Sequence, residues 1–217
     1  MARKRLNDVC PSARILWQAN AMKKRPQLGV LIAYAIASWA YVEASLANFL
    51  TLLLGSNAAP TIAVFMNSKM ASQQIIDVRA AAKAVLSDSD FSLANAVFNL
   101  ASQSAEQRNA LAHSLWGYSD DVPDGIIAVS PIHYLNENFK NAVGDQVVQR
   151  FDKPHKREIW VYKEEDLLEI IEQIESLWSY IPMLVSLNTH DDDVRRQVWE
   201  QFKKFPEFMD VLPTSIT

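Results

Sequence analysis

The chain has 217 residues, of which 49% are hydrophobic and 21% charged, and it contains only 5 glycines, 9 prolines and one cysteine. This composition excludes a glycine-rich, all-β or low-complexity chain and predicts a mainly helical globular fold. The formal net charge is −4. The single Cys10 excludes an internal disulfide framework and a thiolate metal cluster, and it is consistent with a cytoplasmic protein.

The first predicted element is a short amphipathic helix over residues 11–25. Ile15, Leu16 and Ala19 would share one side of it. Pro26 is expected to end this helix, because proline cannot donate the hydrogen bond that a helix interior requires.

Residues 28–54 predict a long and very hydrophobic helix, with Gly55 as its stop. Basic residues precede it, and this combination resembles a signal anchor or a membrane span. Glu43 and Asn48 lie near its middle, where polar groups are costly in lipid. We therefore expect a central helix of a soluble bundle, with a membrane-spanning helix as the alternative.

Two further long helices are expected over residues 60–87 and 91–116, from apolar residues at helical spacing. Between them, residues 87–90 read Ser-Asp-Ser-Asp, which predicts a turn with a helix N-cap. Gly117 is expected to stop the second of these helices.

The pattern then changes to strands. Residues 126–135, 146–151 and 157–162 are rich in β-branched and aromatic side chains and predict a small antiparallel hairpin or meander. Helix returns over residues 164–187, where Pro182 is expected to kink or split it.

A last helix is predicted to follow the Thr-His-Asp-Asp-Asp run at residues 189–193. His190 and its acidic neighbours form a candidate metal site, but an N-cap with acids favoured by the helix dipole is the preferred interpretation. Together the elements predict one α-rich domain: a bundle core over 28–117, a β elaboration over 126–162 and C-terminal helices over 164–205.

The candidate functional residues lie at 106–117, in the sequence EQRNALAHSLWG. At about 100° per residue, Glu106, Asn109 and His113 share one helix face, whereas Arg108 lies about 140° from His113. Histidine exchanges protons near neutral pH, and arginine offers a permanently charged, forked donor to phosphate oxygens. On spacing alone, a packed histidine and a solvated arginine explain these residues better than catalysis does.

The run R-N-A-L-A-H at residues 108–113 resembles the arginine–polar–x3–histidine signature of the HEPN superfamily. Its members are helical bundles, often dimeric, and many are metal-independent RNA endonucleases of toxin–antitoxin, phage-defence or RNA-processing systems. The resemblance covers roughly residues 28–117. It implies Arg108, Asn109 and His113 as catalytic residues, with Glu43 or Glu106 in support.

This resemblance implies a reaction without a metal or other cofactor, in which the RNA 2′-OH is the nucleophile and the product carries a 2′,3′-cyclic phosphate. RNA, a second copy of the chain and an antitoxin or regulatory protein are the expected partners. Residues 1–28 contain seven Lys or Arg against one acid, and residues 138–163 contain six against three. These basic zones would guide the RNA backbone; in the second of them, the candidates are Arg150, Lys153, Lys156 and Arg157.

A binding module is the second interpretation. In that case Arg108 and His113 hold a nucleotide or phosphate without cleaving it, or tie helices together in a non-catalytic scaffold. An arginine bonded to Glu43 beside a buried histidine favours structure, whereas solvent-open side chains favour catalysis.

Overall fold

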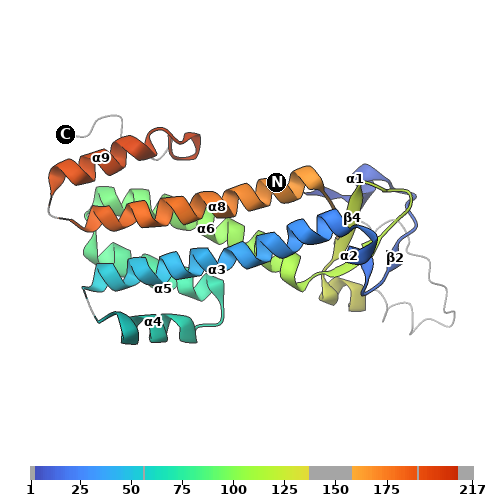
Figure 1. The fold of residues 1–217 in the computed structure, drawn as a ribbon, viewed down its shortest axis with the longest axis horizontal. Coiled ribbons are helices and arrows are strands. Elements are labelled where there is room, and N and C mark those ends of the chain that lie inside the picture. Colours follow the sequence, from blue (N-terminus) through green and yellow to red (C-terminus); the bar gives the residue numbers. More distant parts are fainter. Residues whose placement is uncertain (1–2, 56, 137–157, 190, 210–217) are drawn as a thin grey trace. The chain divides into compact units, whose positions relative to one another are not determined.

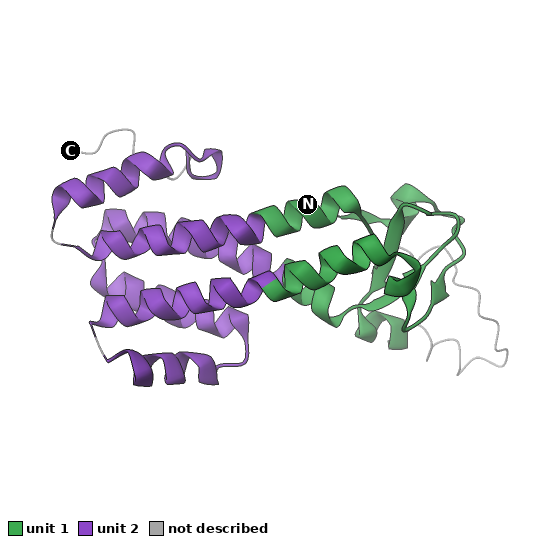
Figure 2. Cartoon of the chain, viewed as in Figure 1, with its two compact units in different colours: residues 1–37, 107–172 green, residues 38–106, 173–217 purple. Residues whose placement is uncertain are grey.

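The computed structural model describes residues 3–55, 57–136, 158–189 and 191–209. These residues are mainly helical and include one five-stranded antiparallel sheet, which confirms the predicted fold class at that level (Figure 1). The predicted strand over 146–151 lies outside the described residues. The chain divides into two compact units (Figure 2). Unit 1 consists of residues 1–37 and 107–172, and unit 2 consists of residues 38–106 and 173–217.

Three helices have residues in both units. These are α3 (Pro26–Leu54), α6 (Asp88–His113) and α8 (Glu164–Val185). The predicted helix 28–54 is therefore confirmed. Gly55 ends it at a φ of 54°, a conformation that a side chain disfavours.

Unit 1 contains the sheet, with strand order β1–β5–β4–β3–β2. The strands span Lys4–Arg5, Leu16–Trp17, Leu115–Tyr118, Gly125–Val129 and Ile159–Lys163 for β1 to β5. Both edge strands have only two residues, and short edges of this kind resist pairing with other chains. Two short helices, α1 (Leu6–Val9) and α2 (Ala21–Lys24), complete the N-terminal segment.

One face of this sheet packs into a hydrophobic core. Val122, Ile127, Val129, Ile159 and Val161 are buried there together with Leu6 and Ala13. Because strand residues alternate between the two faces, Trp160 and Tyr162 lie on the face opposite Ile159 and Val161.

The predicted helix over residues 11–25 is wrong in its first half. Leu16 and Trp17 form β2, paired with Tyr118 and Gly117, and only residues 21–24 are helical. Pairing with a strand a hundred residues later outweighs the local helical spacing. Pro26 begins α3 instead of only ending a helix, because the first position of a helix needs no amide donor.

Gly117 is also not a helix stop. Helix α6 ends at His113, and Gly117 lies inside β3. A Cβ at this position would lie 2.8 Å from Cε3 of Trp17 and 3.0 Å from Cγ2 of Ile15. The glycine therefore allows the close approach of β2.

Substituting Gly117 with alanine is expected to lower the free energy of unfolding by about 1–3 kcal/mol, the usual effect of overpacking. Chemical denaturation followed by tryptophan fluorescence measures this change. Leu115→Ala serves as the control, since Leu115 is exposed on the same strand, and is expected to cost less. An alanine variant at Gly117 as stable as the wild type would contradict the close approach.

Unit 2 is helical in all its described residues with regular secondary structure. Its part of α3 contacts its part of α6 through Phe49 and Phe98, whose ring centroids are 6.1 Å apart. The rings of Tyr41 in α3 and Trp178 in α8 are in contact, with their centroids 4.9 Å apart and their planes tilted by 34°. The single helix predicted over 60–87 is wrong: α4 (Ala58–Asn67) and α5 (Ala71–Val85) are separate.

The C-terminal predictions hold more closely. Helix α8 matches the predicted 164–187, and Pro182 lies inside it without ending it. The short 3-10 helices η2 (Ser186–Asn188) and η3 (Pro206–Phe208) flank α9 (Asp192–Phe202). The Asp191 carboxylate accepts from the amides of Asp193 and Val194, as expected of the N-cap.

Candidate functional site

The residues of the predicted motif lie at the end of α6. Arg108, Asn109 and His113 belong to the unit 1 part of this helix. Two residues after His113 the chain enters β3. The Ser114 hydroxyl donates to the Ala110 carbonyl at 2.6 Å, and this bond satisfies one of the last helical carbonyls. The motif therefore lies at a junction between helix and sheet.

Arg108 and Asn109 form a side-chain pair. Nη1 of Arg108 donates to Oδ1 of Asn109 at 3.1 Å, and both side chains are half-buried. Nε of Arg108 is buried and has no hydrogen-bond partner among the described residues. Because a guanidinium has five N–H donors, this pairing orients Arg108 while leaving donors for another ligand.

His113 is exposed in the last turn of α6. Half-burial of Arg108 and exposure of His113 agree with their offset of about 140° around an ideal helix.

The two supporting carboxylates belong to unit 2. Glu43 is half-buried, and its Oε1 accepts from Nε1 of Trp39 at 2.9 Å, one turn earlier in α3. Glu106 is exposed on α6, just before the boundary between the units. The hydrogen bond from Trp39 gives Glu43 a structural role within α3. A role for Glu43 or Glu106 beside His113 stays a prediction.

The four expected RNA-binding residues Arg150, Lys153, Lys156 and Arg157 lie outside the described residues, as does His190. In the part of the chain that is described, no group of three or more His, Cys, Asp or Glu residues could hold a metal ion. Asp191 acts as the cap of α9, so the interpretation of this run as an N-cap is the one that its geometry supports.

A cationic and aromatic cluster on the sheet was not predicted. Nη1 of Arg3 donates to the Tyr162 hydroxyl at 2.9 Å. The Arg3 guanidinium carbon lies 4.3 Å from the centroid of the Trp160 ring, and that of Arg5 lies 5.6 Å from it. Tyr162 also contacts Trp116, with ring centroids 5.8 Å apart. Only the pairing of β1 with β5, more than 150 residues later, brings these side chains together.

Burial raises the pKa of the Tyr162 phenol, and the nearby Arg3 opposes this rise. Because the phenol has a higher pKa in the folded state than in the unfolded state, it contributes stability that is fully present below pH 10. This contribution is lost as the pH rises from 10 through the folded-state pKa. We expect the free energy of unfolding to fall above pH 10 less steeply in Tyr162→Phe than in the wild type. Both proteins retain Lys163, whose pKa is raised by its ion pair with Asp124, so the difference isolates the phenol. Equal slopes in denaturation from pH 8 to 11.5 would refute this assignment.

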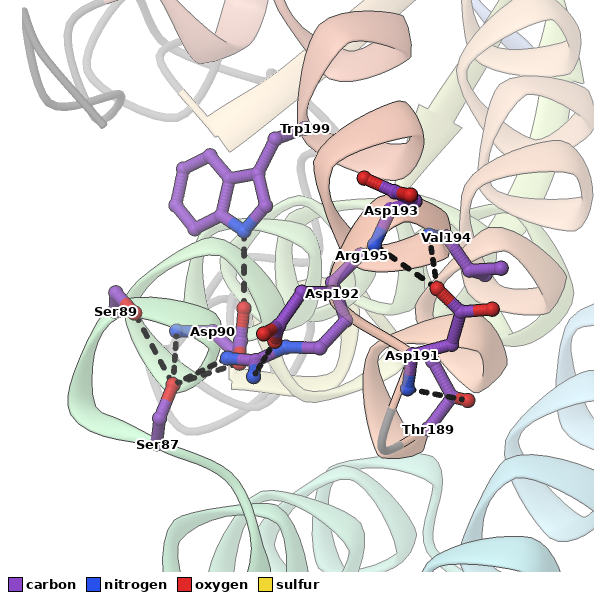
Figure 3. A network of polar contacts seen from close by, with 10 residues as sticks. All are labelled: Ser87, Ser89, Asp90, Thr189, Asp191, Asp192, Asp193, Val194, Arg195 and Trp199. Carbon is purple, nitrogen blue, oxygen red and sulfur yellow. Dashed lines mark hydrogen bonds and ion pairs between the residues drawn. The ribbon is translucent and has the colours of Figure 1, made fainter. Parts of the chain in front are cut away.

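A second polar network surrounds Asp90, a buried residue of unit 2 that sequence analysis identified only as part of a cap (Figure 3). Its Oδ1 accepts from Nε1 of Trp199 at 2.9 Å, and its Oδ2 accepts from the Ser87 hydroxyl at 2.6 Å. Arg195 forms an ion pair with the same Oδ2. Among the described residues, the donors to this carboxylate come from Ser87, directly before α6, and from α9, so we interpret the network as structural.

Comparison of the chain with protein-family models, with curated proteins and with solved structures finds no match. Helix α3 is long and apolar enough to cross a membrane by length and composition, and 39% of its most hydrophobic window is buried. The core helix of a soluble protein passes the same test.

Proposed function

We propose that this protein is a metal-independent RNA endonuclease of the HEPN type. The observation that supports this proposal is the end of α6. There a half-buried Arg108 is oriented by Asn109, its Nε has no hydrogen-bond partner among the described residues, and His113 is exposed. A fixed cation and an accessible imidazole are the two groups that cleavage by the RNA 2′-OH requires.

In the proposed reaction the 2′-oxygen forms a bond to phosphorus, and the bond from phosphorus to the 5′-oxygen breaks. The imidazole of His113 removes the 2′-OH proton, the leaving 5′-oxygen takes a proton from water, and the imidazolium then gives its proton to the hydroxide so formed. Arg108 donates to the phosphoryl oxygens, where negative charge grows. The products are a 2′,3′-cyclic phosphate and a 5′-hydroxyl.

The test is cleavage of a mixed RNA panel in excess EDTA, with DNA of the same sequences as the control. We expect RNA to be cut and DNA to stay intact, because DNA lacks the nucleophile. Mass spectrometry of the products reports the cyclic phosphate. A wild-type protein inert on the whole panel, or one that cuts only with added metal, would refute the proposed function.

A homodimer is part of this proposal. In unit 2, α3 exposes Ala40, Tyr41, Ala44, Asn48 and Leu52, none of them charged. Trp178 of α8 is half-exposed against Tyr41. An uncharged face can pair with its own copy without like-charge repulsion, and we propose a second copy as its partner. Sedimentation equilibrium without detergent measures the molar mass and is expected to give that of a dimer. It also shows whether the protein is soluble without detergent, as we propose for a cytoplasmic protein.

From the same resemblance we propose that such an enzyme belongs to a toxin–antitoxin or phage-defence system, with an antitoxin or regulatory protein as a further partner. A non-catalytic nucleotide- or RNA-binding module is the second candidate. The pairing of Arg108 with its own neighbour Asn109 favours it, since a guanidinium held in this way can bind phosphate without any proton transfer. Tight RNA binding without cleavage on the same panel would select this second candidate.

A further inference from the structure

Strand β1 places two arginines on the aromatic face of the sheet. Arg5 pairs directly with Trp160 across β1 and β5, and Arg3 lies two residues away on the same side of β1. Both guanidinium groups lie over the Trp160 ring. Lys4, between them, is exposed, so three consecutive cations occupy this edge of the sheet.

Stacking on an aromatic ring occupies the flat face of a guanidinium and leaves its N–H groups in the plane free to donate. Arg3 uses one donor on Tyr162. Within the described residues, no carboxylate forms an ion pair with Arg3 or Arg5. Two oriented cations with no acidic partner among the described residues fit an external anion whose oxygens accept forked hydrogen bonds, and phosphate has that geometry.

A series of contacts connects this cluster to the proposed active site within unit 1. Trp116 follows His113 by three residues and contacts Tyr162, which accepts the hydrogen bond from Arg3. In the strand order, β3 and β1 are three strand spacings apart, or about 14 Å at roughly 4.8 Å per spacing. An RNA strand that crosses this face from β3 to β1 therefore spans at least this distance.

The geometry points to Arg3 and Arg5, held by Trp160, as a binding site for the phosphate backbone of the RNA substrate. This inference rests on the proposed function and adds the surface that positions its substrate. The contacts are with phosphates and therefore independent of sequence.

The test uses fluorescence anisotropy of a short labelled single-stranded RNA in EDTA, with His113→Ala present in every protein so that no cleavage occurs. Arg3→Gln/Arg5→Gln is expected to weaken binding roughly 20-fold near 0.1 M salt. It should also make the slope of log K against log salt shallower by about 1.4, the loss of two single-strand phosphate contacts. Arg3→Lys/Arg5→Lys keeps both charges and is expected to bind with intermediate affinity.

Lys69→Gln/Lys83→Gln is the matched control, because it removes the same charge from exposed residues that lie outside both basic zones. It is expected to change binding much less. Arg5→Gln alone leaves the hydrogen bond between Arg3 and Tyr162 intact. Weaker RNA binding by this variant would therefore reflect the lost phosphate contact and not a misfolded sheet. Equal affinities of the Arg3/Arg5 and Lys69/Lys83 variants would overturn the inference, as would Arg3/Arg5-dependent binding to anionic vesicles by a protein that binds no RNA.

The two proposals fail separately. If the wild type cuts RNA and Arg3→Gln/Arg5→Gln leaves KM unchanged, the binding site is wrong and the enzyme stands. If RNA binds through Arg3 and Arg5 and is never cut, the enzyme is wrong and the binding site stands.

Discussion

Replacing Arg195 with alanine is expected to lower the free energy of unfolding by about 3–5 kcal/mol. Asp90 is only 2% exposed, and Arg195 is the cation that forms its ion pair. Without Arg195 the carboxylate stays buried with two neutral donors, Ser87 and Trp199, and forms no other ion pair with a described residue. At roughly 2–4 °C per kcal/mol for a chain of this size, the melting temperature falls by about 6–20 °C.

Arg196→Ala is a control on the next residue of the same helix. Arg196 is 65% exposed and pairs with Asp193, which is 79% exposed, so its loss is expected to cost less than about 1 kcal/mol. A double-mutant cycle with Asp90→Ala then measures the coupling. We expect the double variant to lose less free energy of unfolding than the two single variants lose together, because removing both partners leaves no buried charge. Equal stabilities of the Arg195 and Arg196 variants would contradict the structural role of the network.

The second large effect is expected on activity. His113→Ala should lower the rate of RNA cleavage by about 10²–10⁴-fold, the usual contribution of a positioned acid or base. Because His113 is exposed, its replacement should change the free energy of unfolding by less than about 0.5 kcal/mol. Single-turnover cleavage in EDTA, beside thermal unfolding of the same preparation, separates the two quantities.

His133→Ala is the matched control, a second histidine of unit 1 outside the proposed site, and its cleavage rate should equal that of the wild type. Arg108→Ala is expected to slow cleavage to a similar degree as His113→Ala. Arg108→Lys keeps the charge and loses the fork, so it should recover only part of the rate. Full activity of His113→Ala would exclude the imidazole as the proton-transferring group.

Local signals predicted the elements whose boundaries depend on local chemistry. Gly55 ends α3 because its backbone adopts a positive φ, and Asp191 caps α9 with its own side chain. The interruption between α4 and α5 gave no such signal, because residues 67–71 contain neither glycine nor proline. Strands β1 and β2 were missed for another reason: two residues show no periodicity, and their partners lie 100 or more residues away.

The candidate site divides in the same way. The sequence places Arg108, Asn109 and His113 on one helix, and helical geometry alone predicts their angular offsets. It could not predict that Arg108 pairs with Asn109 or that Glu43 pairs with Trp39, since each side chain had several partners within reach. The networks of Asp90 and of Arg3 join residues more than 100 positions apart and leave no pattern in the sequence.

Each of the two units consists of segments that are separate in the chain. The sheet of unit 1 cannot gain β5 until residues 159–163 have been synthesised, and unit 2 needs α9 from still later. The long intervening loops must therefore close before either unit gains its non-local contacts, and this entropic cost slows folding. No single cut in the chain releases one unit whole, so fragments made for separate study would have to join discontinuous segments.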